Sequence, residues 1–160
     1  MTPGHPAPDF DAPDQHGTRH RLSDYRGRWL ALYFYPRDDT PGCTKQACSL
    51  RDHRSQLAAH DVAVLGVSAQ GAAAHRAFTE KYALNFPLLI DEDMRIARAY
   101  GALGGGPGGL LRRWLGAYRR ITFLIGPDGR IAHIIDHPEV GRHGEELLAL
   151  LRARKSITGA

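Results

Sequence analysis

The sequence has few cysteines and no long apolar run, and each shortage excludes a class of protein. No apolar stretch approaches the roughly 20 residues that a membrane-spanning helix needs. The segment from Met1 to Pro6 has no basic flank followed by an apolar core, so we see no secretory signal and expect a cytoplasmic protein. The 160 residues include two cysteines, and in a reducing compartment these argue against a permanent structural disulfide and for transient redox chemistry.

The sequence also lacks a strong excess of one charge. It contains 21 lysines and arginines and 17 acidic residues, which gives a net charge of +4. Of the basic residues only Lys45, Lys81 and Lys155 are lysines. A nucleic-acid-binding surface needs clustered basic residues with aromatic residues among them, and the sequence shows neither. We therefore expect no nucleic-acid partner and no membrane partner, and we expect the protein to be a monomer.

Apolar segments that read as buried strands alternate with helical segments along most of the chain. Residues 10–17 predict a short strand that runs into a turn, and residues 22–27 predict one helical turn. The other predicted strands are 29–35, 62–67, 86–90, 121–125 and 131–135, and the predicted helices are 43–59, 72–82, 93–100 and 145–154. The turn Gly126-Pro-Asp-Gly129 joins the last two strands into a β-hairpin. This order predicts a single domain, residues 1–160, with a thioredoxin-like α/β fold in which helices cover both faces of a central mixed sheet.

One segment is unusually rich in glycine. From Gly101 to Gly109 the chain has six glycines in nine residues, which predicts a flexible loop. Its G-x-G-x-x-G match follows a predicted helix instead of a strand, so we expect no nucleotide site there. The apolar and arginine residues of 110–118 predict a short helix that packs on the domain beside the active site; a membrane-surface helix is the alternative.

Cys43 is the candidate nucleophile. It lies between the predicted strand 29–35 and a helix-forming stretch, at or near the start of that helix. At a helix amino terminus, unpaired N–H groups and the positive end of the helix dipole favour an anion. The anionic thiolate is the reactive form of cysteine.

The residues around Cys43 resemble the active site of the peroxiredoxins. The run from Tyr33 to Asp52, YFYPRDDTPGCTKQACSLRD, is most similar to the bacterioferritin comigratory protein branch, also called Q-type. The similarity continues at 7–10, 65–68, 86–89 and 120–125, and so covers nearly the whole chain. The resemblance implies a cofactor-free peroxidase for hydrogen peroxide and organic hydroperoxides.

The resemblance also implies roles for individual residues. Cys43 is expected to attack the terminal peroxide oxygen and become a sulfenic acid, while the Thr40 hydroxyl hydrogen-bonds at the thiolate and Pro36 shields the pocket. Arg120 matches the arginine whose permanent charge and planar fork favour the thiolate and orient two oxygens. Arg119 is its competitor, but alternation along a strand sends the two side chains to opposite faces. Thr40 has the alternative role of a helix cap.

For Cys48 the resemblance implies the second step of the cycle. Five residues of helix place its Cα roughly 8–9 Å from that of Cys43, beyond the limit of about 7 Å for a disulfide. Our hypothesis is that this turn unwinds after Cys43 is oxidised, so that Cys48 can condense with the sulfenic acid. Thioredoxin or a similar dithiol protein would then reduce the disulfide. Alternatively Cys48 is a small buried apolar residue, and an external thiol is needed.

Two other functions compete with this one. A copper-carrier-like protein could bind metal through Cys43, Cys48 and His53, although the two cysteines lie on different helix faces and no fourth ligand is evident. A thiol–disulfide oxidoreductase would carry a Cys-x-x-Cys motif, which is absent. Gln46 stands where the branch often has glutamate, and we assign this difference little chemical effect.

Overall fold

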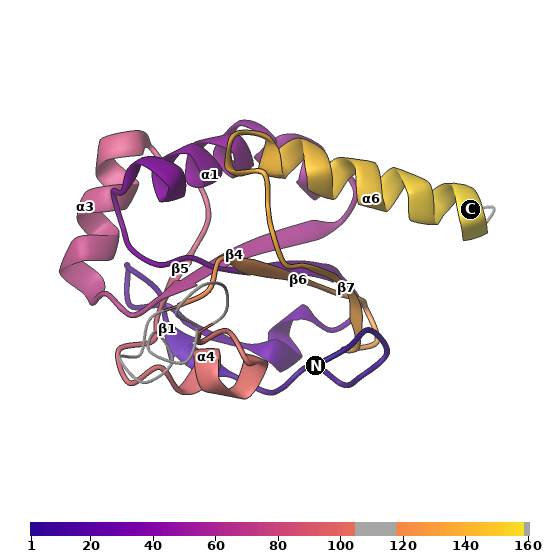
Figure 1. The fold of residues 1–160 in the computed structure, drawn as a ribbon, viewed down its shortest axis with the longest axis horizontal. Helices are drawn as coiled ribbons and strands as arrows, with labels where there is room; N and C mark the ends of the chain where they lie inside the picture. Colours follow the sequence, from indigo (N-terminus) through magenta and orange to yellow (C-terminus); the bar gives the residue numbers. More distant parts are fainter. Residues whose placement is uncertain (105–117, 159–160) are drawn as a thin grey trace.

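The computed structural model describes residues 1–104 and 118–158, with side chains described as far as Arg154. Its centre is a five-stranded sheet in the order β5-β4-β3-β6-β7 (Figure 1). The strands are β3 (Trp29–Phe34), β4 (Val62–Ser68), β5 (Leu88–Ile90), β6 (Ile121–Ile125) and β7 (Ile131–Ile135). Strands β3, β4 and β5 are parallel to one another. Strand β6 runs antiparallel to β3, and β7 runs antiparallel to β6, so the sheet is mixed, as predicted.

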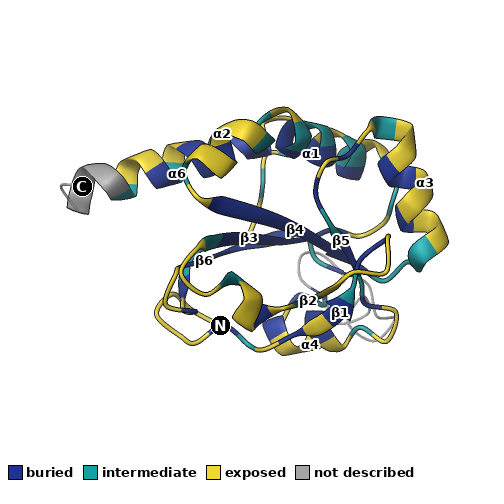
Figure 2. Cartoon of the chain, turned by 180° about the vertical axis from the view of Figure 1, so that it is seen from behind, coloured by how far each residue is buried: buried dark blue, intermediate teal, exposed yellow. Residues whose placement is uncertain are grey.

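Helices and short strands cover both faces of this sheet, and both layers are visible in Figure 1. On one face lie α1 (Pro41–Asp52), α2 (Arg54–Ala59), α3 (Ala72–Tyr82), η2 (Val140–Arg142) and α6 (His143–Thr158). On the other lie β1 (Asp11–Pro13), β2 (Arg19–Arg21), η1 (Leu22–Tyr25) and α4 (Arg95–Tyr100). The strands β3 and β4 are buried along nearly their whole length, and the helices turn their buried residues toward the sheet (Figure 2). The predicted arrangement is therefore confirmed.

Several element boundaries differ from the prediction. The helix expected over 43–59 begins at Pro41, because proline suits the first position of a helix, and it is divided at His53 into α1 and α2. The short strand expected within 10–17 is Asp11–Pro13, and a turn follows it as predicted; it pairs with β2, which was not predicted. The last helix is longer than expected and begins at His143. The predicted loop beyond Gly104 and the predicted helix over 110–118, except for Tyr118, lie outside the described residues.

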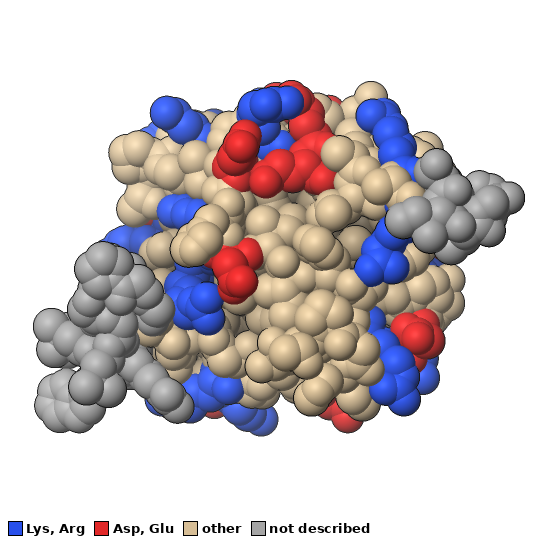
Figure 3. All heavy atoms as spheres, turned by 45° about the vertical axis from the view of Figure 1, so that its right-hand side comes forward, with Lys and Arg blue, Asp and Glu red and all other residues tan. Residues whose placement is uncertain are grey.

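The surface agrees with the nearly balanced composition. On the face in Figure 3, the described lysine and arginine side chains are spread around the margin, and acidic side chains lie together near the top. Within the described parts of the chain, no helix combines the length and the apolar character needed to span a membrane.

Candidate active site

Cys43 lies where the chain passes from the central strand β3 to helix α1. It is the third residue of α1, so its N–H belongs to the first turn, whose N–H groups have no partner within the helix. These groups and the helix dipole favour a thiolate at this position. The residue is only 1% exposed and belongs to the apolar cluster that also holds Tyr33, Tyr35 and Ala47.

Arg120 reaches the sulfur of Cys43 from a distant part of the chain. It directly precedes β6, which pairs antiparallel with β3 so that Ile121 lies opposite Phe34. This register brings Arg120 to the end of β3 from which the chain continues to Cys43. Its Nη2 lies 3.2 Å from Cys43 Sγ, and its Nη1 donates a hydrogen bond of 2.8 Å to Gln46 Oε1. The guanidinium therefore contacts the thiol and the following helical turn together.

Arg119 points elsewhere, as the alternation of side chains predicted. Its Nη2 pairs with Asp136 Oδ1 at 3.1 Å, and its Nη1 donates to the carbonyl of Gly101 at 3.4 Å. Of these two arginines, Arg120 is the one that contacts Cys43.

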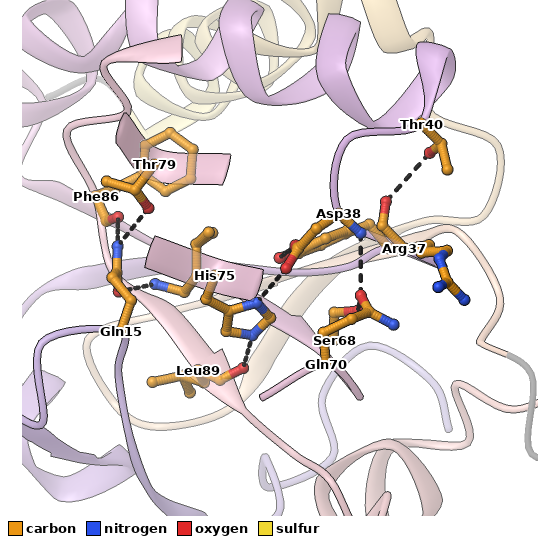
Figure 4. Close-up of polar contacts among 12 residues, drawn as sticks. Gln15, Arg37, Asp38, Thr40, Ser68, Gln70, His75, Thr79, Phe86 and Leu89 are labelled. Carbon is orange, nitrogen blue, oxygen red and sulfur yellow. Dashed lines mark hydrogen bonds and ion pairs between the residues drawn. The ribbon is translucent and has the colours of Figure 1, made fainter. Parts of the chain in front are cut away.

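Thr40 and Pro36 lie in the loop between β3 and α1. Thr40 occupies the N-cap position of α1, but its side chain makes no capping hydrogen bond. Its hydroxyl instead donates to the carbonyl oxygen of Arg37 at 3.1 Å (Figure 4). Pro36 is exposed at the start of the loop. The roles expected for both residues at the thiolate remain predictions.

Cys48 lies on the same uninterrupted helix as Cys43. Helix α1 runs from Pro41 to Asp52, and both cysteines are free, Cys43 buried and Cys48 half-buried. Five residues of regular helix separate their Cα atoms by about 8–9 Å, so the two sulfurs cannot bond while α1 is intact. The structure has the reduced, fully folded geometry that our hypothesis starts from.

Nothing in the described residues supports the metal-binding alternative. They contain no group of three or more histidine, cysteine or acidic side chains that could hold a metal ion. His53 Nδ1 lies 2.8 Å from the carbonyl oxygen of Ser49, to which it donates because a carbonyl only accepts.

Comparison with known proteins gives the family. The model of the AhpC/TSA family matches residues 3–134. The chain is 39% identical to the peroxiredoxin Bcp of Escherichia coli K12, over 91% of this chain and 92% of that protein, and 38% identical to the Bcp of Bacillus subtilis, over 93% and 94%. The chain belongs to the AhpC/TSA family of peroxiredoxins. It is a thiol-dependent peroxidase.

Solved structures agree with this assignment. The peroxidoxin BcpB of Mycobacterium tuberculosis superimposes with a TM-score of 0.82 at 34% identity, and a cysteine-to-serine mutant of Xylella fastidiosa PrxQ with 0.88 at 31%. Each comparison covers 96% of this chain and 97% of the other. The thioredoxin-like fold predicted for this peroxiredoxin is thus confirmed.

Gln46 is the residue of the peroxiredoxin site to which the sequence analysis gave no role. It follows Cys43 by three positions and so lies on the same face of α1. It is fully buried, and its side-chain oxygen accepts the hydrogen bond from Arg120. The spacing alone could have drawn attention to Gln46, but its partner Arg120 is 74 positions away in the sequence.

Two buried polar atoms near the thiol have no hydrogen-bond partner among the described residues. They are the hydroxyl of Tyr33 and the Nε2 of Gln46. Burial raises the pKa of Tyr33 well above its ordinary value, and negative charge at Cys43 raises it further. The Tyr33 hydroxyl therefore stays protonated, which leaves it a potential donor near Cys43.

A buried histidine lies behind Arg120. Thr122, two residues further along the chain, donates from its hydroxyl to His143 Nε2 at 2.8 Å, and His143 Nδ1 donates to Glu146 at 3.0 Å. Burial is the largest of the effects that lower the pKa of His143, and the positive charge of Arg120 adds to it. His143 is therefore neutral, and Arg120 is the cation that contacts the thiol.

Proposed function

We propose that the protein reduces hydroperoxides by a two-cysteine cycle, in which Cys43 is oxidised by the substrate and Cys48 resolves the product. The single observation that carries the proposal is the contact of 3.2 Å between Arg120 Nη2 and Cys43 Sγ at the amino terminus of α1. A buried thiol beside a permanent cation and unpaired N–H groups is suited to ionise and to attack.

In the first step the Cys43 thiolate attacks the terminal oxygen of the hydroperoxide. The O–O bond breaks, a sulfenic acid forms at Cys43, and the leaving oxygen takes a proton to become an alcohol or water. The guanidinium of Arg120 and the N–H groups of α1 lie where they can stabilise the charge that develops. We expect the Thr40 hydroxyl to turn from the Arg37 carbonyl to the peroxide, and Pro36 to shield the reacting atoms.

In the second step the Cys48 thiolate attacks the sulfur of the sulfenic acid. The S–O bond breaks, a disulfide joins Cys43 to Cys48, and water leaves. Because five helical residues hold the sulfurs apart, α1 must unwind between them first. A dithiol protein such as thioredoxin then reduces the disulfide to two thiols and is itself oxidised.

The substrate class follows from the shape of the site. Cys43 is only 1% exposed, which favours a slender terminal O–OH group over a bulky one. The bacterioferritin comigratory protein of Xanthomonas campestris has been studied for alkyl peroxide reduction, and it resembles this chain with a TM-score of 0.84 at 27% identity. We therefore propose hydrogen peroxide and organic hydroperoxides as substrates of a protein that works as a monomer.

The test compares the wild type with Cys43→Ser and Cys48→Ser in a thioredoxin-coupled peroxide assay, followed by intact mass. Cys43→Ser should be inactive. Cys48→Ser should consume one equivalent of peroxide and then stop, with a mass increase of sulfenic or higher acids. Full steady turnover by Cys48→Ser with thioredoxin alone would refute the resolving role, and turnover by Cys43→Ser would refute the proposed nucleophile.

A further inference from the structure

A buried histidine and aspartate pair lies beneath the loop that leads to Cys43, residues 36–40. His75, on α3, is completely buried, and its Nδ1 lies 2.6 Å from Asp38 Oδ2 (Figure 4). Its Nε2 lies 2.9 Å from the carbonyl oxygen of Leu89 on β5. Neither His75 nor Asp38 has a role in the cycle described above.

The hydrogen bonds fix where the protons of this pair lie. The Leu89 carbonyl only accepts, so His75 Nε2 carries a proton. Asp38 accepts a second hydrogen bond at Oδ1 from the Tyr35 hydroxyl, at 2.6 Å. Burial raises the pKa of Tyr35 well above its ordinary value, so its hydroxyl is the donor. One further proton is then shared between His75 Nδ1 and Asp38 Oδ2, and every polar side-chain atom of the pair has a partner.

The pair joins the loop to a firmly held helix. Gln15 is buried between α3 and β5: its Nε2 donates to Thr79 Oγ1 at 3.0 Å and to the Phe86 carbonyl at 3.2 Å, and its Oε1 accepts from the Leu88 N–H at 2.8 Å. These bonds, drawn in Figure 4, fix α3 against the sheet. His75 therefore lies on a helix whose position against the sheet is fixed.

The loop is held at two successive residues. The backbone N–H of Asp38 donates to Gln70 Oε1 at 3.0 Å, in addition to the side-chain contacts above. Asp39 has a φ of 59°, a left-handed conformation that costs free energy for a residue other than glycine. Its carboxylate accepts from Lys81 and from the Tyr82 hydroxyl, each at 2.8 Å, and both belong to α3. Contacts with α3 thus maintain a strained loop conformation.

We propose that His75 is a positioning residue, which acts through Asp38 to place loop 36–40 and the start of α1 for the attack by Cys43. Asp38 lies midway between Pro36 and Thr40, so a shift of its carboxylate displaces both residues expected to contact the peroxide. His75 touches neither the sulfur nor the expected position of the substrate. This inference rests on the proposed function of Cys43.

The test measures the single-turnover oxidation of Cys43 by peroxide in His75→Ala, in Asp38→Asn and in a matched control, His133→Ala, whose histidine lies on the edge strand β7. His75→Ala should slow the reaction roughly ten-fold or more, since displacing reacting groups by ~1 Å can cost about a hundred-fold. His133→Ala should react like the wild type. Asp38→Asn should lose less of the rate, because its amide can donate to His75 Nδ1 and still accept from Tyr35.

Comparison of two Asp38 variants separates positioning from a merely structural role. The groups that face the imidazole are Asp38 from the loop, Tyr35 directly after β3 and the Leu89 carbonyl from β5. Asp38→Asn and Asp38→Ala remove the same charge, but the amide keeps hydrogen bonds to His75 and to Tyr35 and the methyl group keeps neither. We therefore expect the oxidation of Cys43 to be slower in Asp38→Ala than in Asp38→Asn.

The outcomes distinguish this inference from the proposed function. A wild-type rate in folded His75→Ala, or equal rates in Asp38→Asn and Asp38→Ala, would overturn the positioning role of His75. If His75→Ala does not fold, the comparison of Asp38→Asn with Asp38→Ala decides. A wild type without peroxidase activity, or an active Cys43→Ser, would instead overturn the function proposed for Cys43.

Discussion

At the scale of single residues, the guanidinium of Arg120 is held from two sides. Gln46 accepts a hydrogen bond from one of its nitrogens, while the other lies against Cys43. A glutamine partner holds the group without neutralising it, so the full positive charge acts on the thiol. On the other side Gly42 has no side chain, and this leaves the space that the guanidinium occupies. Both neighbours thus determine where the charge of Arg120 lies.

Gly42→Ala should slow the oxidation of Cys43 without unfolding the protein. A Cβ at this position would lie 3.1 Å from Arg120 Nη2, so the guanidinium must move by a few tenths of an ångström. Since an off-rotamer side chain costs ~0.5–1.5 kcal/mol, we expect the single-turnover rate with peroxide to fall about three- to ten-fold. Gly141→Ala is the control, because its Cβ would meet nothing within 4 Å. Equal rates in the two variants would contradict this account.

At the scale of elements, the two halves of α1 are held by different contacts. In the carboxyl-terminal half, Ser49 Oγ accepts from the Gly144 N–H at 3.0 Å, and Arg51 Nη1 donates to the Tyr82 carbonyl at 2.6 Å. In the amino-terminal half the long-range hydrogen bonds come from Arg120. In the proposed cycle, oxidation of Cys43 changes the group that Arg120 contacts, so it would act on the half of α1 that we expect to unwind.

The helical stability of this half should set the rate of disulfide formation. Lys45 is exposed between the two cysteines, and glycine at such a position costs about 1 kcal/mol relative to alanine. Lys45→Gly should therefore form the 43–48 disulfide up to about five-fold faster than Lys45→Ala, while both consume the first peroxide at the same rate. Mass spectrometry of samples quenched at successive times measures both steps. Equal rates of disulfide formation would show that unwinding of α1 does not limit the second step.

Elements with a strong local pattern could be predicted from the sequence, and those made by distant contacts could not. The central strands and α3 were predicted closely because their apolar residues repeat with the period of a strand or a helix. The division at His53 depends on tertiary packing: a Cβ on Gly144 would come within 2.6 Å of the His53 ring. The strand β2 has no apolar pattern, and its two arginines both pair with Asp11.

The same distinction applies to the site. Cys43, Thr40 and Pro36 lie in one continuous motif, so the sequence could identify them as a group. Gln46 and His75 could not be recognised in this way, because their partners, Arg120 and Asp38, lie 74 and 37 positions away. The resemblance to a family indicates the residues that we expect to react, and the folded structure adds those that contact them.

At the scale of the whole molecule, His143 joins parts of the chain that surround the active site. It begins α6, and its ring bonds to Thr122 on β6 and to Glu146 one turn along α6. The next residue, Gly144, donates to Ser49 on α1. The buried imidazole thus lies where α1, β6 and α6 meet.

This buried imidazole predicts that the protein loses stability as the pH falls below about 6.5, the ordinary pKa of histidine. Burial lowers the pKa of His143 in the folded state, so the unfolded chain takes up the proton first. The contribution of neutral His143 to the free energy of unfolding is complete above a pH of about 6.5. It is lost, by at most about 1.4 kcal/mol per pH unit, as the pH falls toward the pKa of His143 in the folded state. Urea unfolding at pH 7.5 and 5.5 should show a smaller pH effect in His143→Gln than in the wild type, and an unchanged effect in the exposed control His5→Gln. An unchanged pH effect in His143→Gln would mean that the loss of stability in acid originates elsewhere in the molecule.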